Sequence, residues 1–200
     1  MSPMSTVHKN PEDLSLLFQI SQILDQSIDI KQVIKPVLRA VADNMGISRG
    51  TITLLNRNSG EISIEAALGL SPSEQEKGRY KLGEGITGKV VQTGQPQVIP
   101  NIAEDSRFLN RTGARNTKNE NISFICVPIK IGNETIGAFS IDSEFQSDAD
   151  LEKQVRLLSI VSSLIAQAVK IRHSILEERN QLLEENNRLQ QELKAKYQPN

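Results

Sequence analysis

The sequence predicts an α+β domain with an antiparallel sheet, followed by a long C-terminal helix. Apolar residues recur at helical spacing in residues 10–46, and alternating apolar runs joined by short turns follow in residues 51–66 and 122–142. From Asp148 to about Tyr197 neither Gly nor Pro interrupts the chain. Strands linked by hairpins form antiparallel sheets, and an uninterrupted stretch of this length favours one continuous helix.

Two helices are predicted before the first strand. Residues 1–10 carry no periodic pattern and are expected to form a disordered tail. The first helix starts at Asn10-Pro11. Its apolar stripe contains Leu14, Leu17, Phe18 and Leu24, and it is widened by Leu16, Ile20 and Ile23, so a second packing partner is expected. Asp29 is the predicted cap of the second helix, which ends at Gly46 and carries Pro36 on its polar face.

Four strands are predicted as two hairpins. Residues 51–56 and 61–66 are joined by a turn at Asn58-Ser59-Gly60. Ile122–Ile131 is apolar on both faces, which is typical of a central strand covered on both sides, and a turn leads from it to a strand at 135–142.

The stretch between the two hairpins is rich in glycine and is predicted to bend over a small-molecule pocket. It contains a short helix that Gly94 ends and a short strand at 97–99. Residues 83–89 match a phosphate-binding P-loop, but Val90 stands where Ser or Thr must hold magnesium. Because the neighbouring strands are antiparallel, we reject a nucleotide hydrolase.

A basic loop follows this strand. Asn101 and Glu104 have the spacing of a helix N-terminus, so a further helix is expected there. Arg107, Arg111 and Arg115 come next, and Arg111-Thr112-Gly113 offers a guanidinium, a hydroxyl and a flexible backbone that suit capture of a carboxylate. The alternative is that these arginines are solvated loop charges.

A heptad repeat runs through the long C-terminal helix, which is about 75 Å long at 1.5 Å per residue. Position a holds Leu158, Ile165, Arg172, Arg179, Asn186 and Leu193, and position d holds Val161, Ala168, Ile175, Leu182 and Leu189. We predict that residues 11–171 form the domain and residues 172–200 a coiled-coil linker. Asn at position a selects two parallel strands, whereas Arg172 and Arg179 weaken the seam. A solvated surface helix is the alternative.

Composition excludes several classes of protein. The chain has 200 residues, with 23 Lys plus Arg against 24 Asp plus Glu, and this balance offers no electrostatic surface for nucleic acid. One cysteine excludes a disulfide framework and fits a reducing cytoplasm. We recognise no signal peptide and no apolar run of membrane-spanning length, so a cytoplasmic protein without membrane contact is expected.

No catalytic constellation stands out. His8 lies in the tail and His173 in the long helix, so neither is placed to activate Cys126 as a nucleophile. Cys126 is expected to be a buried, inert thiol, and two histidines with one cysteine do not make a zinc or haem site. The chain is therefore predicted to be a non-enzyme without metal or cofactor.

The runs RYKLGEGITGKVV, FLNRTGAR and SFICVPIKIG, with ERNQLLEENNRLQQEL in the long helix, closely resemble the N-terminal GAF domain of NifA-type nitrogen-fixation regulators. The resemblance covers roughly residues 14 to 197. It implies a GAF sheet of five or six antiparallel strands flanked by helices, and a regulatory role. In such sigma-54-dependent activators a coiled linker leads to an AAA+ ATPase and a helix-turn-helix, so we interpret the chain as an excised regulatory fragment.

The family resemblance also implies what the domain senses. Relatives respond to 2-oxoglutarate, to redox or metal centres, or to a partner such as NifL or a PII protein. Relatives with a redox or metal centre carry several cysteines, and this chain has one, which leaves 2-oxoglutarate or a partner protein as the signal. The alternatives are a small GAF-fold enzyme such as a thiol reductase and a cyclic-nucleotide-binding GAF module, although the cyclic-nucleotide signature is not recognisable.

In a GAF sheet the connecting segment folds over one face of the central strands. The resemblance therefore implies a pocket in which guanidiniums and hydroxyls meet an aromatic floor. The candidate ligand-binding residues are Arg79, Tyr80, Arg111, Thr112, Arg115, Ser123, Phe124 and Cys126.

Overall fold

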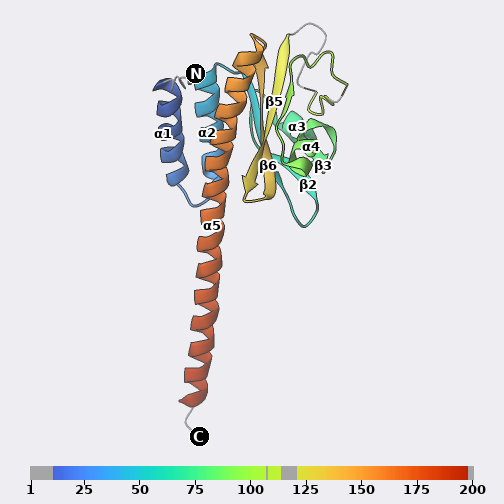
Figure 1. Cartoon of the computed structure of the whole chain (residues 1–200). Helices are drawn as coiled ribbons and strands as arrows, with labels where there is room; N and C mark the ends of the chain where they lie inside the picture. Colours follow the sequence, from blue (N-terminus) through green and yellow to red (C-terminus); the bar gives the residue numbers. More distant parts are fainter. Residues whose placement is uncertain (1–10, 107, 114–120, 198–200) are drawn as a thin grey trace, which may run out of the picture.

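A single antiparallel sheet lies at the centre of the protein (Figure 1). In the computed structural model, which describes residues 11–106, 108–113 and 121–197, six strands pair in the order β3-β2-β1-β6-β5-β4. Their bounds are β1 Arg49–Leu55, β2 Glu61–Leu68, β3 Arg79–Lys81, β4 Gln97–Ile99, β5 Ile122–Ile131 and β6 Glu134–Glu144. The predicted α+β class and the antiparallel sheet are confirmed.

Five helices accompany these strands within the described part of the chain. They are α1 Pro11–Asp25, α2 Ile30–Met45, α3 Pro72–Lys77, α4 Gly85–Thr93 and α5 Asp148–Lys196. Helices α1, α2 and α5 lie on one side of the sheet and α3 and α4 on the other, and α5 continues far beyond the rest of the domain (Figure 1). The predicted long C-terminal helix is therefore present.

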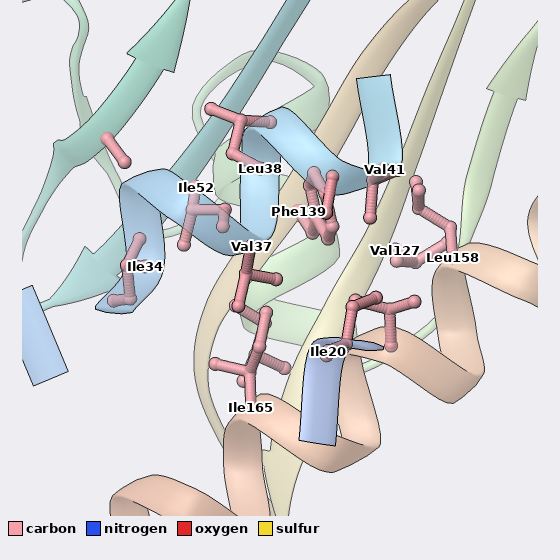
Figure 2. Close-up of a cluster of buried hydrophobic side chains, with 14 of the residues drawn as sticks. Ile20, Ile34, Val37, Leu38, Val41, Ile52, Val127, Phe139, Leu158 and Ile165 are labelled. Atoms are coloured by element: carbon pink, nitrogen blue, oxygen red, sulfur yellow. The ribbon is translucent and has the colours of Figure 1, made fainter. Parts of the chain in front are cut away.

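The larger hydrophobic core fills the space between the sheet and α1, α2 and α5 (Figure 2). Ten fully or almost fully buried side chains from six elements meet there: Ile20, Ile34, Val37, Leu38, Val41, Ile52, Val127, Phe139, Leu158 and Ile165. Each contributes about 1.5–3 kcal/mol relative to an exposed side chain. This layer fixes the sheet as a rigid base for the opposite face.

Helix α2 begins and ends where its sequence signals indicate. Asp29 accepts a hydrogen bond from the Lys31 amide at 3.0 Å, and Gly46 ends the helix with φ 65°, a left-handed conformation that favours glycine. Pro36 lies on the exposed side of the helix, as its place in the apolar pattern predicts.

The predicted apolar stripe of α1 is wrong in part. Leu16, Ile20 and Leu24 face the core, whereas Leu14 and Phe18 are 62% and 67% exposed. The fully buried line has side chains spaced four residues apart, which places them on one face of the helix. Leu17 and Ile23 are half-buried and pack at the margin of the core, and Leu14 and Phe18 remain on the surface.

Helix α5 packs along β5 with its first half and leaves the domain with its second. Arg172 lies at the point of departure and donates hydrogen bonds to the carbonyls of Leu24 at 2.6 Å and Ile28 at 2.8 Å. It therefore contacts the C-terminal end of α1, where carbonyls lack helical partners. The expectation that Arg172 only weakens a coiled-coil seam missed this contact.

We expected no segment long and apolar enough to span a membrane, and by length and composition alone this expectation is wrong. Among the described residues, α5 is long and apolar enough to span a membrane. Its most apolar window has a mean hydropathy of 1.3, and 39% of that window is buried inside the protein. Its apolar side chains Leu158, Val161 and Ile165 belong to the core between α5 and the sheet. Packing in the domain therefore accounts for part of the apolar composition.

A smaller apolar cluster holds α4 and the connecting segment against the opposite face of the sheet; its buried residues include Ile62, Ile86, Val90, Ile99 and Phe124. Gly88 lets α4 approach β3, since a Cβ there would lie 2.3 Å from the Lys81 carbonyl oxygen. Because β3 pairs antiparallel with β2, the setting is not that of a P-loop.

Residues 101–104 form turns, so the helix predicted there is wrong. The Asn101 side chain accepts a hydrogen bond from the Ala103 amide at 3.0 Å. Asn forms such local turns as readily as it caps helices, and the spacing to Glu104 could not distinguish the two.

Candidate ligand site

A small cavity lies under the segment 108–112, on the sheet face that α4 covers. Its volume is about 30 Å³, which is space for about two water molecules, each of which needs at least about 10–15 Å³. The lining residues are Thr51, Ile64, Tyr80, Gly85, Ile86, Thr87, Phe108, Leu109, Asn110, Arg111, Thr112, Phe124 and Ser140. In this form the cavity is closed to a molecule as large as a five-carbon diacid.

Four of the predicted site residues line this cavity: Tyr80, Arg111, Thr112 and Phe124. Phe124 meets the Phe108 ring edge to face, with ring centroids 5.1 Å apart, so the connecting segment is anchored on the central strand by an aromatic pair. Thr112 is buried. Asn110 lies between Phe108 and Thr112 in the chain and has φ 43°, a conformation that Asn adopts more readily than most residues.

Two predicted residues lie elsewhere because neighbouring side chains of a strand point to opposite faces. Arg79 precedes Tyr80 on β3 and pairs with Glu61 at 2.5 Å, an exposed contact outside the cavity. Ser123 precedes Phe124 on β5, and its hydroxyl donates to the Pro100 carbonyl at 2.7 Å. Neither residue lines the cavity. Arg115, also predicted for the site, lies outside the described residues.

Cys126 lies in the smaller apolar cluster and does not line the cavity. Burial raises the pKa of its thiol from 9.0 to about 12, and a hydrogen bond with Thr87 lowers it only in part. The thiol is therefore protonated at neutral pH and buried, a state in which it is a poor nucleophile.

Arg111 has a partner that sequence reasoning missed. Its guanidinium forms an ion pair with Glu84, and it lies over the Tyr80 ring at 5.9 Å from the ring centre. The side chains of Arg111 and Glu84 are 37% and 34% exposed, so the pair is partly screened by solvent. The sequence shows Glu84 as an acidic residue in a glycine-rich turn at the start of a helix, but nothing near it indicates Arg111 as its partner.

A buried hydroxyl pair was also missed. Thr51 on β1 and Ser140 on β6 lie opposite each other in the sheet, and their hydroxyl oxygens are 2.7 Å apart. Both side chains are buried and both line the cavity. Polar residues inside otherwise apolar central strands were the signal for this pair.

An antiparallel sheet with helices on one face and a covered cavity on the other is an architecture suited to holding a small ligand. A model of the GAF domain family matches residues 29–169, well over half of the chain. The chain belongs to the GAF domain family.

Longer proteins named for nitrogen fixation contain a similar segment. The nitrogen fixation protein VnfA of Azotobacter vinelandii is 43% identical over 160 residues, which cover 79% of this chain and 31% of that protein. A Nif-specific regulatory protein of Herbaspirillum seropedicae is 38% identical over 187 residues, which cover 92% of this chain and 34% of that protein. The chain spans about a third of the length of these curated relatives.

These relatives confirm the predicted resemblance to NifA-type regulators, since two of them are named as Nif-specific regulatory proteins rather than as enzymes. The chain is a GAF domain similar to the one that these longer proteins contain.

Solved structures confirm the fold. The GAF domain of A. aeolicus nlh2 in an inactive state is 29% identical, with a TM-score of 0.71 over 80% of this chain and 97% of that one. A free methionine-R-sulfoxide reductase from Neisseria meningitidis, solved with its substrate, is 16% identical, with a TM-score of 0.68 over 88% of this chain and 99% of that one. At that identity the reductase shares the fold alone.

Proposed function

We propose that the chain is the sensory module of a sigma-54-dependent activator of nitrogen-fixation genes. In this proposal it acts in the cytoplasm and controls a downstream AAA+ ATPase, while a helix-turn-helix elsewhere in the protein contacts DNA. The observation that carries the proposal is the similarity to a Nif-specific regulatory protein over 92% of this chain. Because that similarity covers only about a third of the relative, the other domains belong to the proposal.

The signal in this proposal is a small dicarboxylate, with 2-oxoglutarate as the first candidate. Supporting it are a guanidinium and buried hydroxyls around one cavity, from Arg111, Thr112, Thr51 and Ser140. Carboxylates are bound strongly by arginine and by hydroxyl donors in sites with limited water. The closed cavity implies that segment 108–113 moves when a ligand enters.

Dimerisation is the second part of the proposal. Beyond Ile171, α5 exposes an apolar row of the heptad positions: Ile175, Leu182, Leu189 and Leu193. Asn186 lies in the same row, and a buried Asn pair fits two parallel helices better than other assemblies. A second copy of the chain would cover the row and place two GAF domains at the head of one stalk.

Titration calorimetry of the chain with 2-oxoglutarate tests the sensory proposal. The expected result is saturable binding of one molecule per chain. Without binding, regulation by a partner protein of the NifL or PII type replaces ligand sensing. Turnover of a thiol-dependent substrate would instead support the reductase alternative, although the one cysteine has no second thiol to resolve it.

A further inference from the structure

The Glu84 carboxylate is held in a fixed place at the edge of the cavity. One oxygen pairs with Arg111, and the other accepts a hydrogen bond from the Lys81 amide at 2.8 Å. Glu84 is the N-cap residue of α4, yet its side chain makes no capping hydrogen bond. Its carboxylate is therefore directed to Arg111 rather than to the helix.

Arg111 is thus already paired in the closed structure. It lies over the ring of Tyr80, and both residues line the cavity. A ligand carboxylate that approaches this guanidinium meets another carboxylate on the same cation. Two carboxylates at one guanidinium repel each other, so the Glu84 carboxylate opposes the binding of a ligand carboxylate at Arg111.

The inner end of the cavity offers hydrogen-bond donors. The contact between Thr51 and Ser140 uses one of two hydroxyl protons, and the described residues supply no acceptor for the other. Gly85, Ile86 and Thr87, the first turn of the nine-residue helix α4, line the same cavity. First-turn amides have no acceptor within their own helix and favour an anion.

Building on the proposed sensing of a dicarboxylate, we infer that Glu84 is an internal competitor for the ligand. Its carboxylate takes the place at Arg111 that one end of the ligand occupies in the bound state. The other end lies against the hydroxyls of Thr51 and Ser140 and the first turn of α4. The ligand class is therefore a short diacid, whose two ends match the two donor groups.

Glu84→Gln tests the inference, with Glu61→Gln as the matched control. The glutamine keeps the shape of the side chain but removes the charge that competes for Arg111. We expect 2-oxoglutarate to bind Glu84→Gln about threefold to fivefold more tightly than the wild type, the range for loss of a partly exposed ion pair. Glu61 pairs with Arg79 outside the cavity, so the affinity of Glu61→Gln should be unchanged.

The outcomes separate this inference from the proposed function. Binding by the wild type with equal or weaker affinity in Glu84→Gln overturns the competitor and leaves the sensor. Binding by Glu84→Gln alone, with none detectable in the wild type, supports the competitor strongly. Absence of binding in both overturns the dicarboxylate proposal together with this inference.

Tyrosine emission gives a second measurement that does not depend on affinity. The chain has two tyrosines and no tryptophan, so Tyr197→Phe leaves Tyr80 as the fluorophore beneath Arg111. We expect 2-oxoglutarate to change this emission with the midpoint found by calorimetry. A calorimetric binding curve without any change in Tyr80 emission would place the ligand elsewhere and overturn the inference.

Discussion

Single positions along two strands decide which side chains reach the cavity. Tyr80 and Phe124 line it, while Arg79 and Ser123, one position earlier in each strand, do not. A shift of one residue changes the face of the sheet. The choice therefore depends on the pairing register, which the sequence indicates only where apolar and polar residues alternate clearly.

The buried thiol of Cys126 leads to a prediction about the stability of the folded protein at alkaline pH. Since burial raises the pKa of its thiol from 9.0 to about 12, the folded state keeps the thiol neutral while the unfolded state ionises first. The stability that the neutral thiol supplies is complete below about pH 9 and is lost between about pH 9 and 12, at up to about 1.4 kcal/mol per pH unit. Cys126→Val removes this loss.

Urea unfolding at pH 7 to 10.5 measures the effect as the difference between wild type and Cys126→Val. Other groups titrate equally in both proteins, so the difference isolates the thiol. The variant should lose less stability above pH 9. Parallel pH profiles would show that the thiol ionises without penalty, and rapid alkylation of native Cys126 at pH 8 would contradict its burial.

At the scale of elements, periodicity predicted most of the fold. The two hairpins show alternating apolar residues with a clear turn, and α2 and α5 show long helical patterns with clear ends. The observed bounds of these elements differ from the predicted ones by only a few residues. β3 was missed because three residues are too few to show alternation, whereas the turn at Gln95-Pro96 marked the start of the equally short β4. α3 was missed although Ser71 and Glu74 form a capping box with Pro72 between them, a recognisable start signal.

Arg172 connects α5 to the C-terminal end of α1 by hydrogen bonds, and this contact leads to a prediction about stability. Its hydrogen bonds to the carbonyls of Leu24 and Ile28 connect a cation to unpaired groups at a helix C-terminus. Arg172→Gln should reduce the free energy of unfolding by about 1–2 kcal/mol.

Chemical denaturation measures the Arg172 effect against Arg188→Gln. Arg188 pairs with Glu192 on the exposed part of α5, and such surface pairs contribute at most about 1 kcal/mol. Equal stability of Arg172→Gln and Arg188→Gln would mean that the Arg172 contacts contribute nothing to the fold.

At the scale of the molecule, the exposed second half of α5 predicts a parallel dimer. Sedimentation equilibrium of the full chain should give twice the chain mass, and a chain ending at His173 should be a monomer because it lacks the row from Ile175 to Leu193. Asn186→Leu should strengthen association and admit larger assemblies. Equal masses for the full and shortened chains would remove the coiled coil.

Residues of the site that are neighbours in the sequence could be predicted, and residues that are far apart in the sequence could not. The sequence indicated Arg111 and Thr112 because they lie together in one basic loop. It did not reveal Glu84, which lies 27 residues from Arg111, or the contact between Thr51 and Ser140, which joins two distant strands. Such pairs are determined by tertiary folding, and neither residue of a pair carries a local signal for the other.

The central claim is that Arg111 holds a carboxylate of the sensed ligand. Titration calorimetry with 2-oxoglutarate on wild type, Arg111→Ala and Arg79→Ala tests it most directly. Arg79 is the matched control, since its guanidinium pairs with Glu61 outside the cavity. We predict that Arg111→Ala weakens binding at least about tenfold, the effect of losing one charge-assisted hydrogen bond. Arg79→Ala should bind like the wild type, and thermal unfolding of both variants should stay close to that of the wild type. Unchanged affinity in a folded Arg111→Ala would contradict the claim.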